Sequence, residues 1–208
     1  MSFVHKWVPG SGSGGRTLLL LHGTGGNESD LLPLGRVLDG DANLLSPRGK
    51  ILEHGMPRFF KRLAEGVFDQ QDLKFRTAEL AEWIASAAKQ YQTGPVTAVG
   101  YSNGANIAAS LLLSGQATEF DRAVLLRAMT PFEPEVLPDL RGKRILMLNG
   151  THDPIIPPDN SKHLAELLTK AGADVDLRWT NTGHGLEQGE IVEASEWLRT
   201  SMEKDQPR

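Results

Sequence analysis

The sequence predicts an α/β fold in which a mostly parallel central sheet is flanked by helices. Two observations carry this prediction. Short apolar segments alternate along the chain with longer segments of helical spacing, which is the order of βαβ units. The first strong apolar segment, Arg16–His22, is continuously hydrophobic rather than alternating. That pattern is typical of a strand buried on both faces of a parallel sheet.

The remaining elements of the first half are predicted from hydrophobic patterns and from the turn-forming residues between them. In order, we expect an edge strand at 3–8, a Gly/Ser turn at 11–15, a helix at 30–38 and a strand at 42–46. Residues 48–69 have no regular pattern. Apolar residues then recur near helical spacing over Asp72–Tyr91, which predicts a helix, and Pro95–Tyr101 reads as the next strand.

The second half continues the alternation. We expect a helix at 103–114, strands at 121–129 and 143–149, a helix at 159–170, a strand at 175–179 and a helix at 190–202. The final residues, 204–208, are expected to be frayed. Because there is no internal repeat, low-complexity tract or linker, we expect one domain over residues 1–208.

Composition excludes several classes of protein. The 208 residues include 22 Lys and Arg, 26 Asp and Glu, and no cysteine, for a net charge of −4. A thiolate nucleophile, a disulfide and cysteine-ligated zinc are therefore excluded. Mild acidity without a basic run argues against nucleic-acid binding or stable membrane association. The longest apolar run, Leu18–Leu21, is too short to span a bilayer, and Met1–Pro9 lacks signal-peptide features, so we expect a cytoplasmic protein.

A candidate nucleophile stands after the strand at 95–101. Ligands of open α/β sheets bind beyond the carboxyl ends of the strands. There the chain reads Gly100-Tyr101-Ser102-Asn103-Gly104, the G-x-S-x-G pattern of a serine on a sharp strand-to-helix turn. The alternative is an ordinary glycine-rich turn. The strand before Ser102 and the small-residue helix after it favour the nucleophile.

A serine needs a base, and a base needs an orienting acid. His184 lies between two glycines after the last strand, and Asp153 follows the strand at 143–149, which gives the chain order Ser, Asp, His. Asp139 precedes that strand, and Asp159 is better explained as a helix cap. The other histidines are better explained as packing or surface residues, or lie beside residues with a better role: His5, His22, His54, His152 and His163.

Backbone N–H groups are expected to bind a developing oxyanion. The turn after Ser102 directs the N–H of Asn103 to that point, and the loop His22–Gly26 offers the N–H of Thr24. A phosphate-binding loop is the alternative for these glycines. The loop has neither nucleotide-binding fingerprint, so nucleotide binding is not expected.

The irregular segment supplies candidate substrate contacts. An apolar acyl or aryl pocket is one interpretation of three of its side chains: Met56, Phe59 and Phe60. The alternative is that the two phenylalanines pack the loop onto the sheet edge. Arg48 follows a strand end and is a candidate anchor for a substrate carboxylate. An ion pair of Arg48 with Glu53 or Glu65 is the favoured alternative.

Four motifs in order also carry a family resemblance. L-L-L-L-H-G-T-G-G at 18–26, G-Y-S-N-G-A at 100–105, G-T-H-D-P-I-I-P at 150–157 and G-H-G-L at 183–186 resemble the phospholipase/carboxylesterase family of α/β-hydrolases. These are small serine esterases related to acyl-protein thioesterases. The resemblance covers about residues 16–200, and residues 47–69 resemble a bacterial branch of carboxylesterases.

The resemblance implies an α/β-hydrolase fold and a role for each motif. Ser102 would be the nucleophile, Asp153 the acid, His184 the base, and the N–H groups of Thr24 and Asn103 the oxyanion hole. Eukaryotic-type thioesterases usually have glutamine where this chain has Asn103. The donor is a backbone group, so the oxyanion hole should survive, but transfer of thioesterase substrate preference is weakened.

Together these features predict a serine carboxylesterase that acts on short- to medium-chain or aryl carboxylic esters through an acyl-serine. No metal and no organic cofactor are implied. Little chain is left for a large lid. The partner expected is a small-molecule ester, and a homodimer is a further expectation. A lysophospholipase or acyl-protein thioesterase with a long apolar channel, and a non-catalytic binding module on a hydrolase fold, are the alternatives.

Overall fold

A seven-stranded sheet forms the centre of the molecule. The computed structural model describes residues 2–11 and 15–203, so residues 12–14 of the expected turn and the expected fraying at 204–208 lie outside it. The strand order is β1-β3-β2-β8-β9-β10-β11, and only β1 is antiparallel to its neighbour. The strands are β1 (His5–Val8), β2 (Thr17–Leu21), β3 (Asn43–Pro47), β8 (Val96–Tyr101), β9 (Phe120–Leu126), β10 (Arg144–Gly150) and β11 (Asp174–Thr180).

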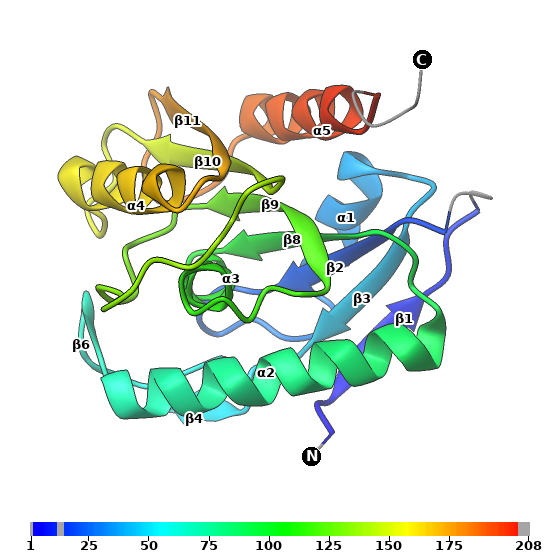
Figure 1. The fold of residues 1–208 in the computed structure, drawn as a ribbon, viewed down its shortest axis with the longest axis horizontal. Coiled ribbons are helices and arrows are strands. Elements are labelled where there is room, and N and C mark those ends of the chain that lie inside the picture. Colours follow the sequence, from blue (N-terminus) through cyan, green and yellow to red (C-terminus); the bar gives the residue numbers. More distant parts are fainter. Residues whose placement is uncertain (1, 12–14, 204–208) are drawn as a thin grey trace.

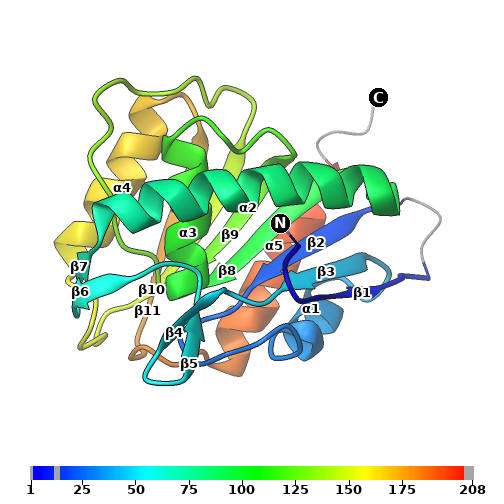
Figure 2. The same cartoon turned by 90° about the horizontal axis from the view of Figure 1, so that it is seen from below.

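Helices cover both faces of this sheet (Figures 1 and 2). They are α1 (Leu32–Leu38), α2 (Gln70–Tyr91), α3 (Asn103–Leu113), α4 (Pro158–Lys170) and α5 (Gln188–Glu203). Helices α2, α3 and α4 contribute to one hydrophobic core, and α1 and α5 to the other. Strand β2 places Leu19 and Leu21 in the first core and Leu18 and Leu20 in the second. The continuous apolar run therefore has the predicted cause, burial on both faces.

The segment 48–69 is more ordered than its sequence indicates. It folds into two antiparallel hairpins beside the carboxyl edge of the sheet, β4 (Ile51–Glu53) with β5 (Met56–Arg58) and β6 (Arg62–Ala64) with β7 (Val67–Phe68). Gly55 and Gly66 lie in the connecting turns at φ of 82° and 72°, a backbone region that favours glycine. Strands of two or three residues are too short to show an alternating pattern.

Most predicted boundaries agree with the structure to within two residues, but one strand end and one helix cap do not. The strand expected to reach Met129 ends at Leu126, because Arg127 adopts a φ of 59° that ends the extended backbone. Asp159 does not cap α4. Pro157 is the N-cap residue, and Asp159 lies in the first turn, where a negative charge favours the helix dipole.

The carboxyl edge of the sheet carries no large lid within residues 2–11 and 15–203, as predicted. Of the helices in those ranges, none is both long and apolar enough to cross a membrane.

Candidate active site

Ser102 stands on the expected turn between β8 and α3. Its φ of 52° and ψ of −111° are strained for a residue with a side chain. A Cβ on Gly100 would lie 2.6 Å from the Gly104 carbonyl oxygen, and a Cβ on Gly104 would lie 1.9 Å from the Leu21 carbonyl oxygen. The backbone N–H of Ser102 donates to the Leu126 carbonyl at 2.8 Å. The two glycines therefore allow the close approach that holds Ser102 above the sheet.

The structure brings the three predicted triad residues together. His184 Nε2 lies 3.0 Å from Ser102 Oγ, and His184 Nδ1 lies 2.7 Å from Asp153 Oδ2. The side chain of Asp153 is 2% exposed, and its Oδ1 accepts the backbone N–H groups of Ile155 and Ile156 at 2.8 and 3.2 Å. A carboxylate so fixed selects the Nδ1–H tautomer of His184, which leaves the Nε2 lone pair facing the serine hydroxyl.

Both predicted oxyanion donors lie at the same pocket as Ser102. Asn103 is the first residue of α3, where a backbone N–H has no acceptor within the helix. Its side-chain Oδ1 accepts the Phe59 N–H at 2.7 Å, and Arg58 Nη1 donates to Thr24 Oγ1 at 2.6 Å. The segment that includes Arg58 and Phe59 thus supports both halves of the predicted oxyanion hole.

His22, the first residue of the loop His22–Gly26, contacts both this loop and the segment after β3. It is buried, its Nδ1 lies 2.7 Å from the Gly23 carbonyl, and its Nε2 accepts the Gly49 N–H at 2.9 Å. Burial lowers the pKa of His22, which favours the neutral ring that these two contacts require.

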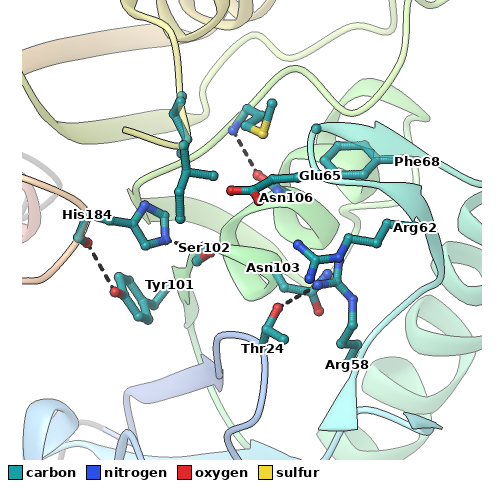
Figure 3. A pocket seen from close by; sticks show the side chains of 14 residues that line it. Thr24, Arg58, Arg62, Glu65, Phe68, Tyr101, Ser102, Asn103, Asn106 and His184 are labelled. Carbon is teal, nitrogen blue, oxygen red and sulfur yellow. Dashed lines mark hydrogen bonds between the residues drawn. The ribbon is translucent and has the colours of Figure 1, made fainter. Parts of the chain in front are cut away.

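The pocket above Ser102 has a volume of about 350 Å³. Figure 3 shows His184 and Tyr101 on one side and the guanidinium groups of Arg58 and Arg62 on the other. Its apolar lining comes from Phe68, Met129, Ile155 and Ile156. None of these four was singled out from the sequence, because they come from segments whose packing is set by the tertiary fold.

The predicted acyl-pocket residues do not line this pocket. Phe59 and Phe60 are buried in the core, with ring centroids 4.8 Å from His22 and 5.0 Å from Phe68 respectively. Met56 is 40% exposed and lies against Gly25. The assignment of all three as pocket residues is therefore wrong. The alternative, that the two phenylalanines pack the loop, is the one observed.

Arg48 also lies away from the pocket, and neither role considered for it is correct. Its Nη2 donates to Glu28 Oε1 at 2.7 Å and its Nε to Glu28 Oε2 at 2.5 Å. This paired hydrogen bond lowers the pKa of Glu28 to about 2. Glu28 lies in the loop after β2, 20 residues before Arg48, and the sequence gives no sign that the two side chains meet.

Arg58 and Arg62 are the cations that reach the pocket. Arg62 Nε contacts both Glu53 carboxylate oxygens at 2.9 and 3.1 Å, and Arg58 Nη1 lies 3.6 Å from Glu53 Oε2. Desolvation, followed by the charge of Arg62, lowers the pKa of Arg58. Two guanidinium groups thus share the Glu53 carboxylate at the pocket wall, and Glu65 also lines the pocket.

Sequence reasoning missed two further residues near His184. Tyr101 OH donates to the His184 carbonyl at 3.1 Å, and Arg127 donates to carbonyls on both sides of His184. A signal for Arg127 was present, because it is a charge inside the apolar run that ends β9 at the carboxyl edge. Among the described residues, no cluster of three or more His, Asp or Glu side chains is arranged to hold a metal ion.

A serine at a strained strand-to-helix turn, hydrogen-bonded to a histidine and through it to an aspartate above a mostly parallel sheet, defines the α/β-hydrolase class. Comparison with known families refines this. Residues 57–195 match the dienelactone hydrolase family, and the chain belongs to that family. It is thus a hydrolase of the dienelactone hydrolase and carboxylesterase type.

Individual relatives agree with this class. The putative hydrolase MhqD of Bacillus subtilis (strain 168) is 47% identical over 199 residues, which cover 95% of this chain and 99% of that protein. A Bacillus cereus carboxylesterase structure is 48% identical with a TM-score of 0.92, covering 96% of this chain and 94% of the other. YahD, solved with malic acid, is 29% identical with a TM-score of 0.90, covering 96% and 99%. The resemblance to small carboxylesterases is confirmed.

Proposed function

We propose that the protein is a serine carboxylesterase that forms an acyl-enzyme on Ser102. The observation that carries the proposal is the hydrogen-bonded series from Ser102 through His184 to Asp153, with contacts of 3.0 and 2.7 Å. A serine hydroxyl is a weak nucleophile until a base accepts its proton. The series supplies that base and the carboxylate that stabilises the imidazolium.

The reaction has two halves that use the same groups. His184 Nε2 takes the Ser102 proton as Oγ attacks the ester carbonyl, and the N–H groups of Thr24 and Asn103 bind the oxyanion. Collapse of this tetrahedral species breaks the bond to the alkoxy oxygen, which leaves as the alcohol with the proton from His184. Water, deprotonated by His184, then attacks the acyl-serine carbonyl; the bond from the acyl carbon to Ser102 Oγ breaks, His184 returns the proton to Oγ, and the carboxylic acid is released.

The pocket favours short- to medium-chain or aryl acyl groups. Its volume of about 350 Å³ is near the lower end for small-molecule sites, and Arg58 and Arg62 interrupt its apolar lining. A lysophospholipase or acyl-protein thioesterase would need a long apolar channel. The mixed lining of the described pocket argues against one.

The same two arginines favour esters that carry a second, anionic carboxylate. The two guanidinium groups carry more N–H donors than the Glu53 carboxylate uses, and Arg can bind a ligand carboxylate bidentately, while the Glu65 carboxylate at the same pocket offsets part of their charge. The structure of YahD with malic acid, a small dicarboxylate, is consistent with this preference.

The central test replaces the nucleophile. Ser102→Ala should lower kcat/KM on p-nitrophenyl acetate about 10⁴-fold or more, the scale expected for loss of a triad nucleophile. A fluorophosphonate probe should label the natural protein at Ser102 and fail to label the variant. Ser86→Ala, at an exposed serine on α2, is the matched control and should retain full activity.

Two outcomes would contradict the proposal. Unchanged turnover in Ser102→Ala would remove Ser102 as the nucleophile. Absence of both labelling and ester hydrolysis in the natural protein would favour the non-catalytic binding module. A panel of p-nitrophenyl esters from acetate to palmitate measures how kcat/KM depends on acyl-chain length. A steep rise of kcat/KM toward long chains would favour the lysophospholipase or thioesterase alternative.

A further inference from the structure

The loop Thr182–Gly185, here called the histidine loop, is held at every one of its four carbonyl oxygens by a donor from outside it. The Thr182 carbonyl accepts the His152 N–H at 3.0 Å, and the Gly183 carbonyl accepts Arg127 Nε at 3.0 Å. The His184 carbonyl accepts Tyr101 OH at 3.1 Å, and the Gly185 carbonyl accepts Arg127 Nη2 at 2.8 Å. Because glycines flank His184, the loop has little conformational preference of its own.

Arg127 supplies two of these four donors from a fully buried position. It follows the last residue of β9, and its φ of 59° turns the side chain out of the strand direction. Besides the two carbonyls, its guanidinium donates to Thr182 Oγ1 at 2.9 Å and to the Leu148 carbonyl at 3.2 Å. One rigid, planar group therefore fixes the peptide units on both sides of His184.

Glu190, in the first turn of α5, neutralises this buried cation. Its Oε1 lies 2.7 Å from Arg127 Nη1, and its Oε2 accepts from Nη2 at 2.8 Å. Thr180 Oγ1 and the Glu187 N–H donate to the same carboxylate at 2.7 and 3.0 Å. The carboxylate is desolvated, yet the hydrogen bond from Arg127 keeps the pKa of Glu190 below its usual value. The pair therefore stays charged.

A role in stability alone does not account for this arrangement. Buried ion pairs are often no more stabilising than apolar residues of similar volume. Glu190 alone would satisfy the charge of Arg127, whereas three further donations go to the histidine loop. Arg127 also follows Leu126, whose carbonyl accepts the Ser102 N–H at 2.8 Å. The end of β9 thus contacts the nucleophile through one residue and the histidine loop through the next.

We infer that Arg127, neutralised by Glu190, is a positioning residue for His184. It holds the histidine loop so that the imidazole contacts Ser102 through Nε2 and Asp153 through Nδ1 at the same time. Tyr101 assists through its single hydrogen bond to the His184 carbonyl. The inference rests on the proposed serine-esterase function for its kinetic consequences, but the placement of His184 is open to test without turnover.

The test removes both charges together. In the double variant Arg127→Met/Glu190→Leu, no unpaired charge is left buried, so the protein should fold. KM should stay within about threefold, and kcat should fall about 100-fold, the effect of misplacing a reacting group by about 1 Å. Arg127→Lys keeps the positive charge but loses the planar guanidinium, so its kcat should lie between those of the natural protein and the double variant. Tyr101→Phe, which removes one donor, should lower kcat by a smaller factor.

A control uses a second ion pair between the central sheet and α5. Arg178 on β11 donates to Glu193 on α5 at 2.9 Å, away from the pocket. Arg178→Met/Glu193→Leu should retain natural kcat and KM. Active-site titration with a fluorophosphonate gives the rate per competent site, which separates a slower site from a smaller folded fraction.

Proton NMR reads the position of His184 independently of catalysis. The strongly hydrogen-bonded Nδ1–H between His184 and Asp153 should give a low-field resonance in the natural protein, and the Arg127→Met/Glu190→Leu variant should lose it while remaining folded. Natural kcat per site with the resonance retained would overturn the inference. If the natural protein hydrolyses no ester, the proposed function fails, and the resonance alone decides the inference. If the double variant does not fold, Arg127→Lys and Tyr101→Phe decide it by the same two measurements.

Discussion

At the scale of single residues, two of the four non-glycine residues with positive φ in the described ranges lie at the candidate site, and the other two, His54 and Gln92, lie in a hairpin turn and at the end of α2. Ser102 and Arg127 have φ of 52° and 59°, and each directly follows a strand, Ser102 after β8 and Arg127 after the neighbouring β9. Such conformations cost about 1–3 kcal/mol each and persist only where the surroundings fix them. Here the fixing contacts are the hydrogen bonds that join Ser102 to Leu126 and Arg127 to the histidine loop. These contacts therefore hold the two strained residues in the conformations that place the candidate nucleophile and the candidate base.

Arg62 gives a prediction about substrate charge. Monoethyl glutarate and ethyl pentanoate have acyl chains of equal length and differ by one carboxylate. Since a hydrogen bond to a charged group contributes about 1.5–3 kcal/mol, we expect kcat/KM to favour the hemiester by about tenfold or more. Arg62→Gln should remove that preference and leave ethyl pentanoate hydrolysis unchanged. A pH-stat measures both.

The control for this prediction is Arg141→Gln, at an exposed cation paired with Asp139 outside the pocket. It should preserve the preference for the hemiester. Equal kcat/KM values for the two esters in the natural protein would show that the arginine pair does not select substrate charge.

The residues that sequence reasoning could place are those that chain order constrains. Ser102, Asp153 and His184 each follow a strand, and parallel strands bring their carboxyl ends to one edge, so order along the chain becomes proximity in space. Arg48 and Phe59 were misplaced because their surroundings depend on contacts that local pattern does not encode. Arg48 pairs across the sheet edge with Glu28, and Phe59 turns into the core beside His22.

At the scale of elements, the buried strands and long helices were predictable, and the hairpins were not. Strand β2 is buried on both faces and is therefore continuously apolar. Helix α2 is long and buried along one side, so its apolar residues recur at helical spacing. The hairpin strands have two or three residues, and their register depends on the glycine turns and on packing beside the site. The site wall is therefore the part of the fold least visible in the sequence.

The contact of α3 with β2 gives an element-scale prediction. A Cβ on Gly104 would lie 1.9 Å from the Leu21 carbonyl oxygen, which is backbone and has little freedom to move. Gly104→Ala should therefore push α3 from the sheet and lower the free energy of unfolding by about 3 kcal/mol or more. Because α3 begins directly after Ser102, activity should fall as well. Urea unfolding and ester kinetics measure the two effects.

Gly189→Ala is the comparison for that experiment. A Cβ at Gly189, in the first turn of α5, meets no atom within 4 Å. Alanine favours a helix over glycine by up to about 1 kcal/mol, so this variant should be as stable as the natural protein or more stable. Equal stability of the two variants would show that the α3–β2 contact tolerates a methyl group.

At the scale of the whole molecule, loops after several strands meet at one edge, and ion pairs join them. Glu28, in the loop after β2, binds Arg48, directly after β3, and Glu53 of the first hairpin binds Arg62 of the second. Hydrogen bonding to arginine lowers the pKa of both carboxylates. The two hairpins and the loop after β2 are thus held by carboxylates that lose their charge in acid. A homodimer stays a prediction, and sedimentation equilibrium would test it.

These ion pairs predict how stability depends on pH. A carboxylate whose pKa is lower in the folded protein stabilises it fully above its unfolded value, and that contribution is lost as pH falls through the folded value. For Glu28 the interval runs from about 4.5 down to about 2. Glu28→Gln should therefore be less stable than the natural protein at pH 7, and the difference should shrink toward zero by about pH 2. Urea unfolding at pH 7, 4 and 2.5 measures it, with Glu135→Gln, at an exposed carboxylate, as the control. A difference that stays constant over this range would show that Arg48 does not hold Glu28 in its charged form.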